Sequence, residues 1–219
     1  MKKPLQYFLS FLFDIKIVDS QSTINPQLKV LLRNGRLILN ANRANYSYDG
    51  LHKVFQIVFD KIGIKKTNPQ SVLILGFGAG SVATILQKEL QINCSITGVE
   101  ADEEVIKLSK VHFQKDFINT TLFIDTAENF IQKCAKTFDL IVVDVFIDLQ
   151  VPVAIQEREF LDKISKLLNP KGQIIYNFVL HSKESRKQFE MLREASNNIF
   201  SEVNILRVLD FNRVLIMAN

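Results

Sequence analysis

The sequence is poor in the residue types that build metal and redox sites. Its 219 residues include no tryptophan, three histidines and two cysteines, Cys94 and Cys134, which lie far apart in the chain. Neither a CxxC motif nor a Cys/His cluster is present, which excludes the common zinc and dithiol patterns. We therefore expect no metal site, and two reduced thiols in a cytoplasmic protein.

Long apolar runs and blocks of like charge are also missing. The N-terminal stretch MKKPLQYFLSFLF resembles a signal peptide, but Asp14 and Lys16 end it well short of the roughly 18 apolar residues that a membrane span needs. Its apolar residues predict a packed N-terminal element. The net charge is +4, with acidic and basic residues interspersed. We therefore expect neither a membrane nor a nucleic acid as partner.

From residue 72 onward, the sequence alternates regularly between apolar and amphipathic segments. The apolar segments predict strands at 72–76, 94–100, 121–125, 138–146 and 173–180, and two more strands within 202–219. The amphipathic segments predict helices at 80–90, 102–113, 127–135, 157–168 and 182–198. This alternation is typical of an α/β fold, with a mostly parallel sheet covered by helices on both faces.

The first 50 residues show a different pattern. Residues 14–20 alternate between apolar and polar, and the two apolar-rich halves of 28–40 surround Asn34-Gly35, a dipeptide that favours a tight hairpin. We therefore predict two domains, a small N-terminal β-hairpin subdomain at 1–50 and the main α/β domain at 51–219.

The first strand of the main domain runs into the motif GFGAG at residues 76–80. Glycine allows positive φ and close approach of a ligand, and helix N–H groups directed at the same place favour a carboxylate. Ser81 stands where a dinucleotide-binding G-x-G-x-x-G motif needs glycine, which disfavours a dinucleotide-dependent oxidoreductase. The pattern is similar to the first motif of S-adenosylmethionine-dependent methyltransferases. We predict that this turn binds the ligand through Gly76, Phe77, Gly78, Ala79 and Gly80.

Acidic residues end the next three strands. Glu100, followed by Ala101, can accept hydrogen bonds from both hydroxyls of a ribose. Asp125 can accept from the exocyclic amine of an adenine, and Thr126 can offer its backbone N–H to the ring; an N-cap role for Asp125 is the alternative. Asp144 follows four apolar residues, at the place where group transfer would occur. Because the carboxyl ends of parallel strands meet at one edge, these residues are predicted to form one ligand site.

Together these motifs resemble the spermidine synthase-like branch of the S-adenosylmethionine-dependent methyltransferase superfamily. The likeness covers the N-terminal hairpin and the segments LILGFGAGS, GVEADEEVIKLSK, DTAENF, FDLIVVDVF and NPKGQIIYNF. It implies a Rossmann-like methyltransferase fold with a mostly parallel seven-stranded sheet. It further implies that Glu100 binds the ribose, and that Asp125 and Thr126 bind the adenine. Asp144 would then be part of the cofactor site and, as the catalytic residue, exchange a proton with the reacting amine.

The sequence departs from that family where the transferred group and the acceptor would bind. Ala79 stands where the family's glycine motif has an aspartate that holds the aminopropyl ammonium. The family's Y-H-E triplet reads LHK at residues 51–53, so that a base replaces the acid. Asp148 lies four residues after Asp144 rather than three, and no proline follows it. These changes remove carboxylates that would pair with a cationic donor and a diamine.

Intact S-adenosylmethionine carries a carboxylate, which suits an alanine at position 79 better than the decarboxylated donor does. We therefore predict S-adenosylmethionine as cofactor and methyl transfer to a small-molecule acceptor. Two alternatives stay open: a polyamine aminopropyltransferase that uses decarboxylated S-adenosylmethionine, and a non-catalytic cofactor-binding homologue. A homodimer also stays open. The residues predicted to line the acceptor site are Tyr48, His52, Asp148 and Tyr176.

Overall fold

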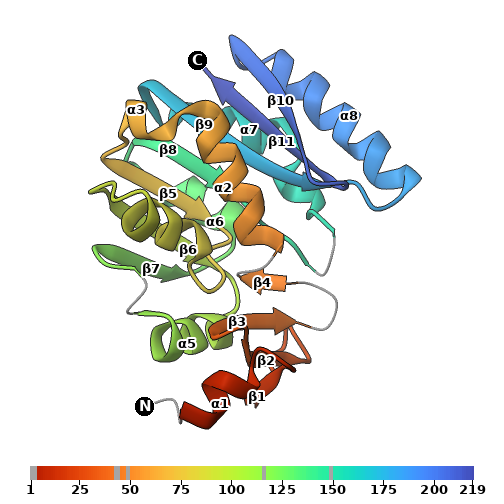
Figure 1. Ribbon diagram of the computed structural model, residues 1–219. Helices are drawn as coiled ribbons and strands as arrows, with labels where there is room; N and C mark the ends of the chain where they lie inside the picture. Colours follow the sequence, from red (N-terminus) through yellow and green to blue (C-terminus); the bar gives the residue numbers. More distant parts are fainter. Residues whose placement is uncertain (1–3, 42–44, 48–49, 115–116, 148–149) are drawn as a thin grey trace.

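Figure 1 shows the computed structural model, which describes residues 4–41, 45–47, 50–114, 117–147 and 150–219. A seven-stranded sheet with helices forms the larger part of the molecule. A four-stranded sheet made by the first 47 residues lies below it in this view (Figure 1).

The strand order of the large sheet is β10-β11-β9-β8-β5-β6-β7. Strands β5 to β9 run parallel to one another, and β11 is antiparallel to both of its neighbours. The predicted α/β fold with a mostly parallel seven-stranded sheet is thereby confirmed. The strands are β5 (Ser71–Leu75), β6 (Ser95–Glu100), β7 (Thr120–Ile124), β8 (Phe138–Val143), β9 (Leu168–Val179), β10 (Glu202–Val208) and β11 (Asn212–Ala218).

Helices cover both faces of this sheet, because the central strands are apolar on both sides. In β5, Val72 and Ile74 belong to one buried cluster and Leu73 and Leu75 to another. The first cluster includes residues of α2 (Gly50–Ile62), α3 (Ile64–Thr67), α4 (Ser81–Thr84), η1 (Ile85–Glu89) and α5 (Glu103–His112). The second includes residues of α6 (Ala127–Lys133), η3 (Val153–Ile155), α7 (Arg158–Lys166) and α8 (Lys183–Asn197).

The N-terminal sheet has the order β1-β2-β3-β4, and each pair is antiparallel. Its strands are β1 (Ile15–Ser20), β2 (Leu28–Arg33), β3 (Arg36–Ala41) and β4 (Asn45–Ser47). The predicted hairpin at Asn34-Gly35 is confirmed, with φ angles of 47° and 74°. Two positive φ angles are what a two-residue turn of this hand requires.

The N-terminal segment differs from its prediction. Helix α1 (Pro4–Leu9) has no buried residue, and Leu5, Phe8 and Leu12 are 68%, 69% and 80% exposed. The segment is held instead by hydrogen bonds of Ser10, whose backbone carbonyl and Oγ accept from the N–H groups of the β2–β3 turn. The prediction of a packed element was therefore wrong, because the hydrogen bonds of Ser10 attach the segment while its exposed apolar side chains lie outside the core.

Two other predicted elements are shorter or more irregular than expected. The helix predicted at 80–90 consists of α4 followed by the π-helical turn η1, in which the Leu90 N–H donates to the Ile85 carbonyl. The strand predicted at 138–146 ends at Val143, so Asp144 is the first residue beyond it.

The two sheets share one hydrophobic core. Leu28 and Leu39 of the N-terminal sheet lie in the same buried cluster as Val54 and Phe55 of α2. The predicted domain boundary after residue 50 thus falls inside a continuous packing unit, and it stays a prediction.

Candidate functional site

The predicted ligand residues follow the carboxyl ends of four neighbouring parallel strands. Residues 76–80 follow β5, Glu100 is the last residue of β6, Asp125 follows β7 and Asp144 follows β8. These strands are adjacent in the order β8-β5-β6-β7 (Figure 1). The fold therefore brings the residues to one edge of the sheet, the edge at which open α/β sheets bind ligands.

The close approach of two strand ends requires glycine at the first position of the GFGAG turn. Gly76 has a φ of 84°, and a Cβ atom there would overlap the backbone carbonyl of Asp144. Both Gly76 and Phe77 donate their N–H groups to the Val99 carbonyl, at 2.9 Å each. Only glycine fits position 76, and its presence keeps the ends of β5 and β8 together.

The two other predicted residues of this turn contribute through the backbone. Ala79 is fully buried, and Phe77 is 4% exposed with its ring packed edge-on against Phe117 at 5.1 Å between centroids. Their side chains belong to the core, so any ligand contact from these positions comes from main-chain atoms.

Glu100 is held in place by the backbone around it. Its Oε2 accepts from the Gly78 N–H at 3.0 Å, and its Oε1 accepts from the Asp102 N–H at 3.1 Å. Burial raises the pKa of this carboxyl and the nearby Asp102 charge adds to the rise, while backbone hydrogen bonds from Asp102, Gly78 and Ala101 oppose it. Each oxygen of a carboxylate has two lone pairs, so Glu100 can accept hydrogen bonds from a ribose diol in addition to those from the backbone.

One backbone N–H of this turn that we expected to bind the ligand binds a protein side chain instead. The Gly78 N–H was expected to face a ligand carboxylate, yet it binds Glu100. Similarly, the Thr126 N–H, expected to face the adenine ring, donates to Asp125 Oδ1 at 2.9 Å. In both places a protein carboxylate, rather than a ligand, uses the backbone donor.

Asp125 lies at the same edge, in a more open environment. Its Oδ2 is 3.4 Å from Lys133 Nζ, and its side chain is 25% exposed. The N-cap of α6 is Thr126, whose Oγ1 accepts from the Asn129 N–H at 3.3 Å. The N-cap alternative for Asp125 is therefore wrong, while its role toward an adenine stays a prediction.

Asp144 is a deeply buried carboxylate directly after β8. It is 8% exposed, and its Oδ1 accepts from Asn177 Nδ2 at 2.9 Å. Burial raises the pKa of Asp144 to about 7; the amide hydrogen bond opposes this rise, and the charge of Glu100 adds to it. A carboxyl that titrates near neutrality can both accept and return a proton, which is what an acid–base residue needs.

One of the predicted acceptor residues, Tyr176, does not face this edge. Tyr176 is fully buried, its hydroxyl donates to the Ile155 carbonyl at 3.1 Å, and burial raises the pKa of the phenol well above its ordinary value. Successive residues of a strand face opposite sides of the sheet, and on β9 it is Asn177 that faces Asp144. The prediction that Tyr176 lines the acceptor site was wrong by one residue.

His52 lies in a contact between helices. Its Nε2 is 2.7 Å from Glu89 Oε1, and Gln56 Nε2 donates to Glu89 Oε2, also at 2.7 Å. Burial alone would raise the pKa of Glu89, but the hydrogen bonds from Gln56 and His52 lower it. The contact joins α2 to η1, and an acceptor role for His52 stays a prediction. Tyr48 and Asp148 lie outside the described residues.

Sequence reasoning missed three polar residues near this edge. Asn177 binds Asp144, and Asn212 Nδ2 donates to Asn177 Oδ1 at 2.9 Å. Asp102 N-caps α5 through its Oδ1, while its Oδ2 accepts from Ser22 Oγ and from Asn25 Nδ2. A signal existed for Asn177, because it is the one amide residue in the run IIYNFVL.

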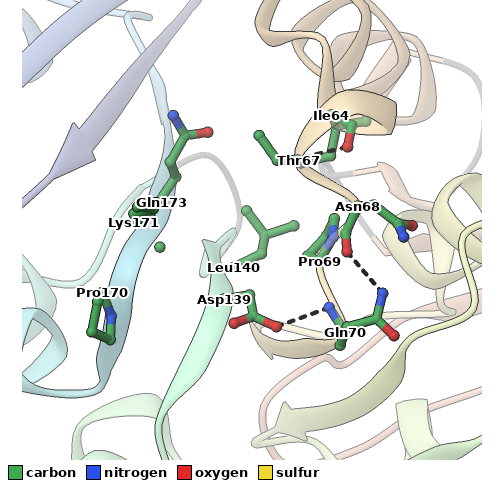
Figure 2. A pocket seen from close by; sticks show the side chains of 11 residues that line it. Ile64, Thr67, Asn68, Pro69, Gln70, Asp139, Leu140, Pro170, Lys171 and Gln173 are labelled. Carbon is green, nitrogen blue, oxygen red and sulfur yellow. Dashed lines mark hydrogen bonds between the residues drawn. The ribbon is translucent and has the colours of Figure 1, made fainter.

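A small cavity lies at the opposite edge of the sheet, next to the start of β5 (Figure 2). It measures about 220 Å³ and is lined by residues that include Gln70, Asp139 and Lys171. The Asp139 carboxylate already accepts from the N–H groups of Gln70 and Ser71 and from Asn169 Nδ2. These bonds tie β8 to β5 and β9, so the cavity is part of the scaffold and remote from the predicted ligand site.

Metal ligands and membrane spans are both missing from the part of the chain that the structure describes. Those residues contain no group of three or more His, Cys, Asp or Glu side chains that could hold a metal ion. None of the helices among them has the length and apolar character needed to cross a bilayer.

The geometry fits a sulfonium nucleoside donor. At Gly76 and Gly80 the space of a Cβ atom is taken by the Asp144 backbone and the Phe117 ring, so these glycines serve the turn itself. Glu100 beside the turn can accept hydrogen bonds from a diol. Asp144, the proposed acid–base group, is close enough for the charge of Glu100 to act on it.

Comparisons with known proteins bear on the fold and the family of the chain. The chain is 34% identical over 116 residues to the polyamine aminopropyltransferase of Thermoplasma volcanium, an alignment that spans 50% of this chain and 41% of the relative. The chain spans less than half the length of the first curated relatives that it matches. Among solved structures, spermidine synthase from Thermotoga maritima superposes with a TM-score of 0.71 at 14% identity, covering 92% of this chain and 72% of that one.

Human methyltransferase-like protein 13, solved in complex with SAH, superposes with a TM-score of 0.65 at 18% identity, covering 78% of this chain and 82% of that one. At these identities the structural likeness establishes the fold. A family model also matches residues 56–209, which is well over half of the chain, and its description is "Spermine/spermidine synthase domain". The chain therefore belongs to the spermine/spermidine synthase domain family.

Proposed function

We propose that this protein is a transferase that moves an aminopropyl group from decarboxylated S-adenosylmethionine to the amine of a small acceptor. The observation that carries the proposal is the pairing of two carboxylates at neighbouring strand ends. Glu100 is fixed by backbone donors for a ribose, and Asp144 is buried with a pKa of about 7. The named relatives of the family support aminopropyl transfer over our first prediction of methyl transfer.

The chain's own residues have three tasks in such a reaction. The sulfonium donor supplies an electrophilic carbon; a C–N bond forms there while the C–S bond breaks and its electron pair stays on sulfur. Glu100 would orient the nucleoside through its ribose, and the glycine turn would pack against it. Asp144 would accept the proton that the amine loses. Orientation and water exclusion are the main sources of rate in this kind of transfer.

A product assay tests the proposal. The protein is incubated with decarboxylated S-adenosylmethionine and putrescine, and the products are followed by mass spectrometry. We expect the aminopropylated diamine and methylthioadenosine in equal amounts. Asp144→Asn should lower the rate by about 10²- to 10⁴-fold, as the loss of a general base does, while exposed Asp60→Asn should not. Donor binding without turnover would favour the non-catalytic alternative instead.

One observation favours methyl transfer as a second candidate. Ala79 is fully buried at the place where the resemblance expects an aspartate for the aminopropyl ammonium. The loss of such a charged partner costs on the order of 2–3 kcal/mol, or roughly 10²-fold in binding. Calorimetry with both donors separates the two candidates, because methyl transfer requires that intact S-adenosylmethionine binds more tightly than its decarboxylated form.

A further inference from the structure

Two amide side chains connect the β11 edge of the site to Asp144. Asn212 Nδ2 donates to Asn177 Oδ1, and Asn177 Nδ2 donates to Asp144 Oδ1, both at 2.9 Å. Asn177 is 1% exposed, and Asn212, the first residue of β11, is partly exposed. In the β9–β11 register Asn212 pairs with Val179 and Asn177 with Val214, so the two amides are diagonal neighbours across the strands.

The chain of hydrogen bonds has a fixed direction. An amide offers a donor on one side and an acceptor on the other. Because Asn212 donates to the oxygen of Asn177, the nitrogen of Asn177 must face Asp144. Without Asn212, the Asn177 amide could turn over and place its oxygen against the carboxylate. Asn212 thus acts on Asp144 through Asn177.

The direction distinguishes the two oxygens of Asp144. Among the described residues, Asn177 is the only one that donates a hydrogen bond to this carboxylate, and it does so on Oδ1. In a neutral acid the carbonyl oxygen accepts hydrogen bonds better than the hydroxyl oxygen, so the N–H on Oδ1 favours the form in which Oδ1 is the carbonyl. Oδ2 is then the oxygen on which the neutral acid holds its proton.

A neutral amide also suits the electrostatics. Lysine or arginine in place of Asn177 would favour the charged carboxylate strongly and weaken it as a base. Glu100, at the end of β6, is the ionisable group in the described part of the chain whose charge acts on Asp144, and it acts in the opposite sense to the amide. Asp144 therefore has one oxygen, Oδ1, in a fixed hydrogen bond, and its proton affinity is moderate.

We propose that Asn177, oriented by Asn212, is a positioning residue that holds Asp144 by Oδ1 and reserves Oδ2 for the proton of the acceptor amine. The inference rests on the proposed function for the source of that proton. The hydrogen-bond chain and its effect on Asp144 can be tested without any turnover.

The test compares Asn177→Leu and Asn212→Leu with Asn204→Leu, which makes the same change at an exposed position on β10. The proteins carry ¹³C at the aspartate side-chain carboxyls, and the Asp144 signal is assigned by its loss in Asp144→Asn. Its titration is followed by NMR. Calorimetry with S-adenosylhomocysteine checks that each variant retains the nucleoside site.

We expect the proton affinity of Asp144 to rise about tenfold in Asn177→Leu, and about threefold in Asn212→Leu, because the hydrogen bond to the charged form is lost or weakened. Asn204→Leu should leave it unchanged. If Asn177→Leu fails to fold, the Asp144 titration in Asn212→Leu, at a partly exposed position, still tests the proposal. An unchanged Asp144 titration in Asn212→Leu or Asn177→Leu would overturn the proposal.

Kinetics provide a second readout where turnover occurs. In each variant, the acid limb of the pH profile of kcat should move to higher pH by the same amount as the Asp144 titration of that variant. The donor KM should stay unchanged. A raised acceptor KM with an unmoved limb would mean that Asn177 contacts the substrate instead, and would also overturn the proposal. Absence of turnover in the unmodified protein would refute the proposed function, yet the NMR titration would still decide the role of Asn177.

Discussion

The two halves of the candidate site are built by different means. On the side proposed to bind the donor, at the ends of β5 and β6, the Glu100 carboxylate is held by backbone N–H groups that include those of Gly78 and Asp102. On the acceptor side, at the ends of β8 and β9, Asp144 is held by a side-chain amide that a second amide orients. One half depends on main-chain geometry, and the other depends on side chains.

This difference suggests which half can change. Backbone donors are fixed by the fold and survive most substitutions, so the nucleoside half should be robust. Side-chain donors can be exchanged one at a time, which alters the pKa of Asp144 without altering the sheet. The departures from the family pattern fall in both halves, because Ala79 lies in the glycine turn of the donor half and Lys53 lies on α2.

The largest effect on ligand binding should come from breaking the donor half at Glu100. Glu100→Gln keeps the shape of the side chain but replaces one acceptor oxygen by a donor, which would face a backbone N–H or a ribose hydroxyl. We expect affinity for S-adenosylhomocysteine or methylthioadenosine to fall by about 100-fold, since two hydrogen bonds to a charged group are weakened. Calorimetry measures this, with exposed Glu103→Gln as the matched control. Equal affinities for the two variants would contradict the ribose assignment.

A smaller effect is expected on stability from the acceptor half. The pKa of Asp144 is about 7 in the folded protein, above its ordinary value of 3.8. Between these values the folded carboxyl keeps a proton that the unfolded chain releases, so this group costs stability as the pH rises toward 7, and the cost then levels off.

Asp144→Asn removes this cost, and the Asn177 amide can still donate to the new side-chain oxygen. The free energy of unfolding of the variant relative to the unmodified protein should therefore increase by about 2 kcal/mol between pH 5 and pH 7. Urea denaturation at several pH values measures it, with exposed Asp60→Asn as control. A difference that stays constant with pH would show that the pKa of Asp144 is not raised in the folded protein.

Sequence patterns predicted which residues lie at the strand ends better than they predicted the partners of those residues, and the reason is geometric. Strand ends follow from apolar runs, so Glu100, Asp125 and Asp144 could be placed at one edge from the sequence alone. The partners of Asp144 depend on the register between β8 and β9, which places Asn177 beside it, and on the register between β9 and β11, which places Asn212 near Asn177. No pattern in one sequence specifies these registers, and Tyr176 was chosen in place of its neighbour Asn177.

Contacts between distant elements were equally out of reach. The link from Ser22 and Asn25 to Asp102 joins residues about 80 positions apart, and the contact of His52 with Glu89 joins two helices. Local periodicity carries information on each element and none on how two of them dock. The exposure of α1 has the same origin, because the apolar pattern of residues 5–13 could not show what would cover them.

The smallest predicted effect sharpens the comparison, because it tests whether the backbone-built half depends on the N-terminal sheet. Asn25 is 5% exposed and donates to Asp102 Oδ2 at 2.7 Å, and the Asp102 N–H in turn holds Glu100. Asn25→Leu should lower the free energy of unfolding by about 1 kcal/mol, the typical value of one hydrogen bond. Affinity for S-adenosylhomocysteine should fall only about threefold, because Asp102 still caps α5 through its Oδ1. Urea denaturation and calorimetry measure the two quantities, with exposed Asn197→Leu on α8 as control. A loss of affinity as large as that of Glu100→Gln would mean that the N-terminal sheet, and not the glycine turn, determines the geometry of the donor half.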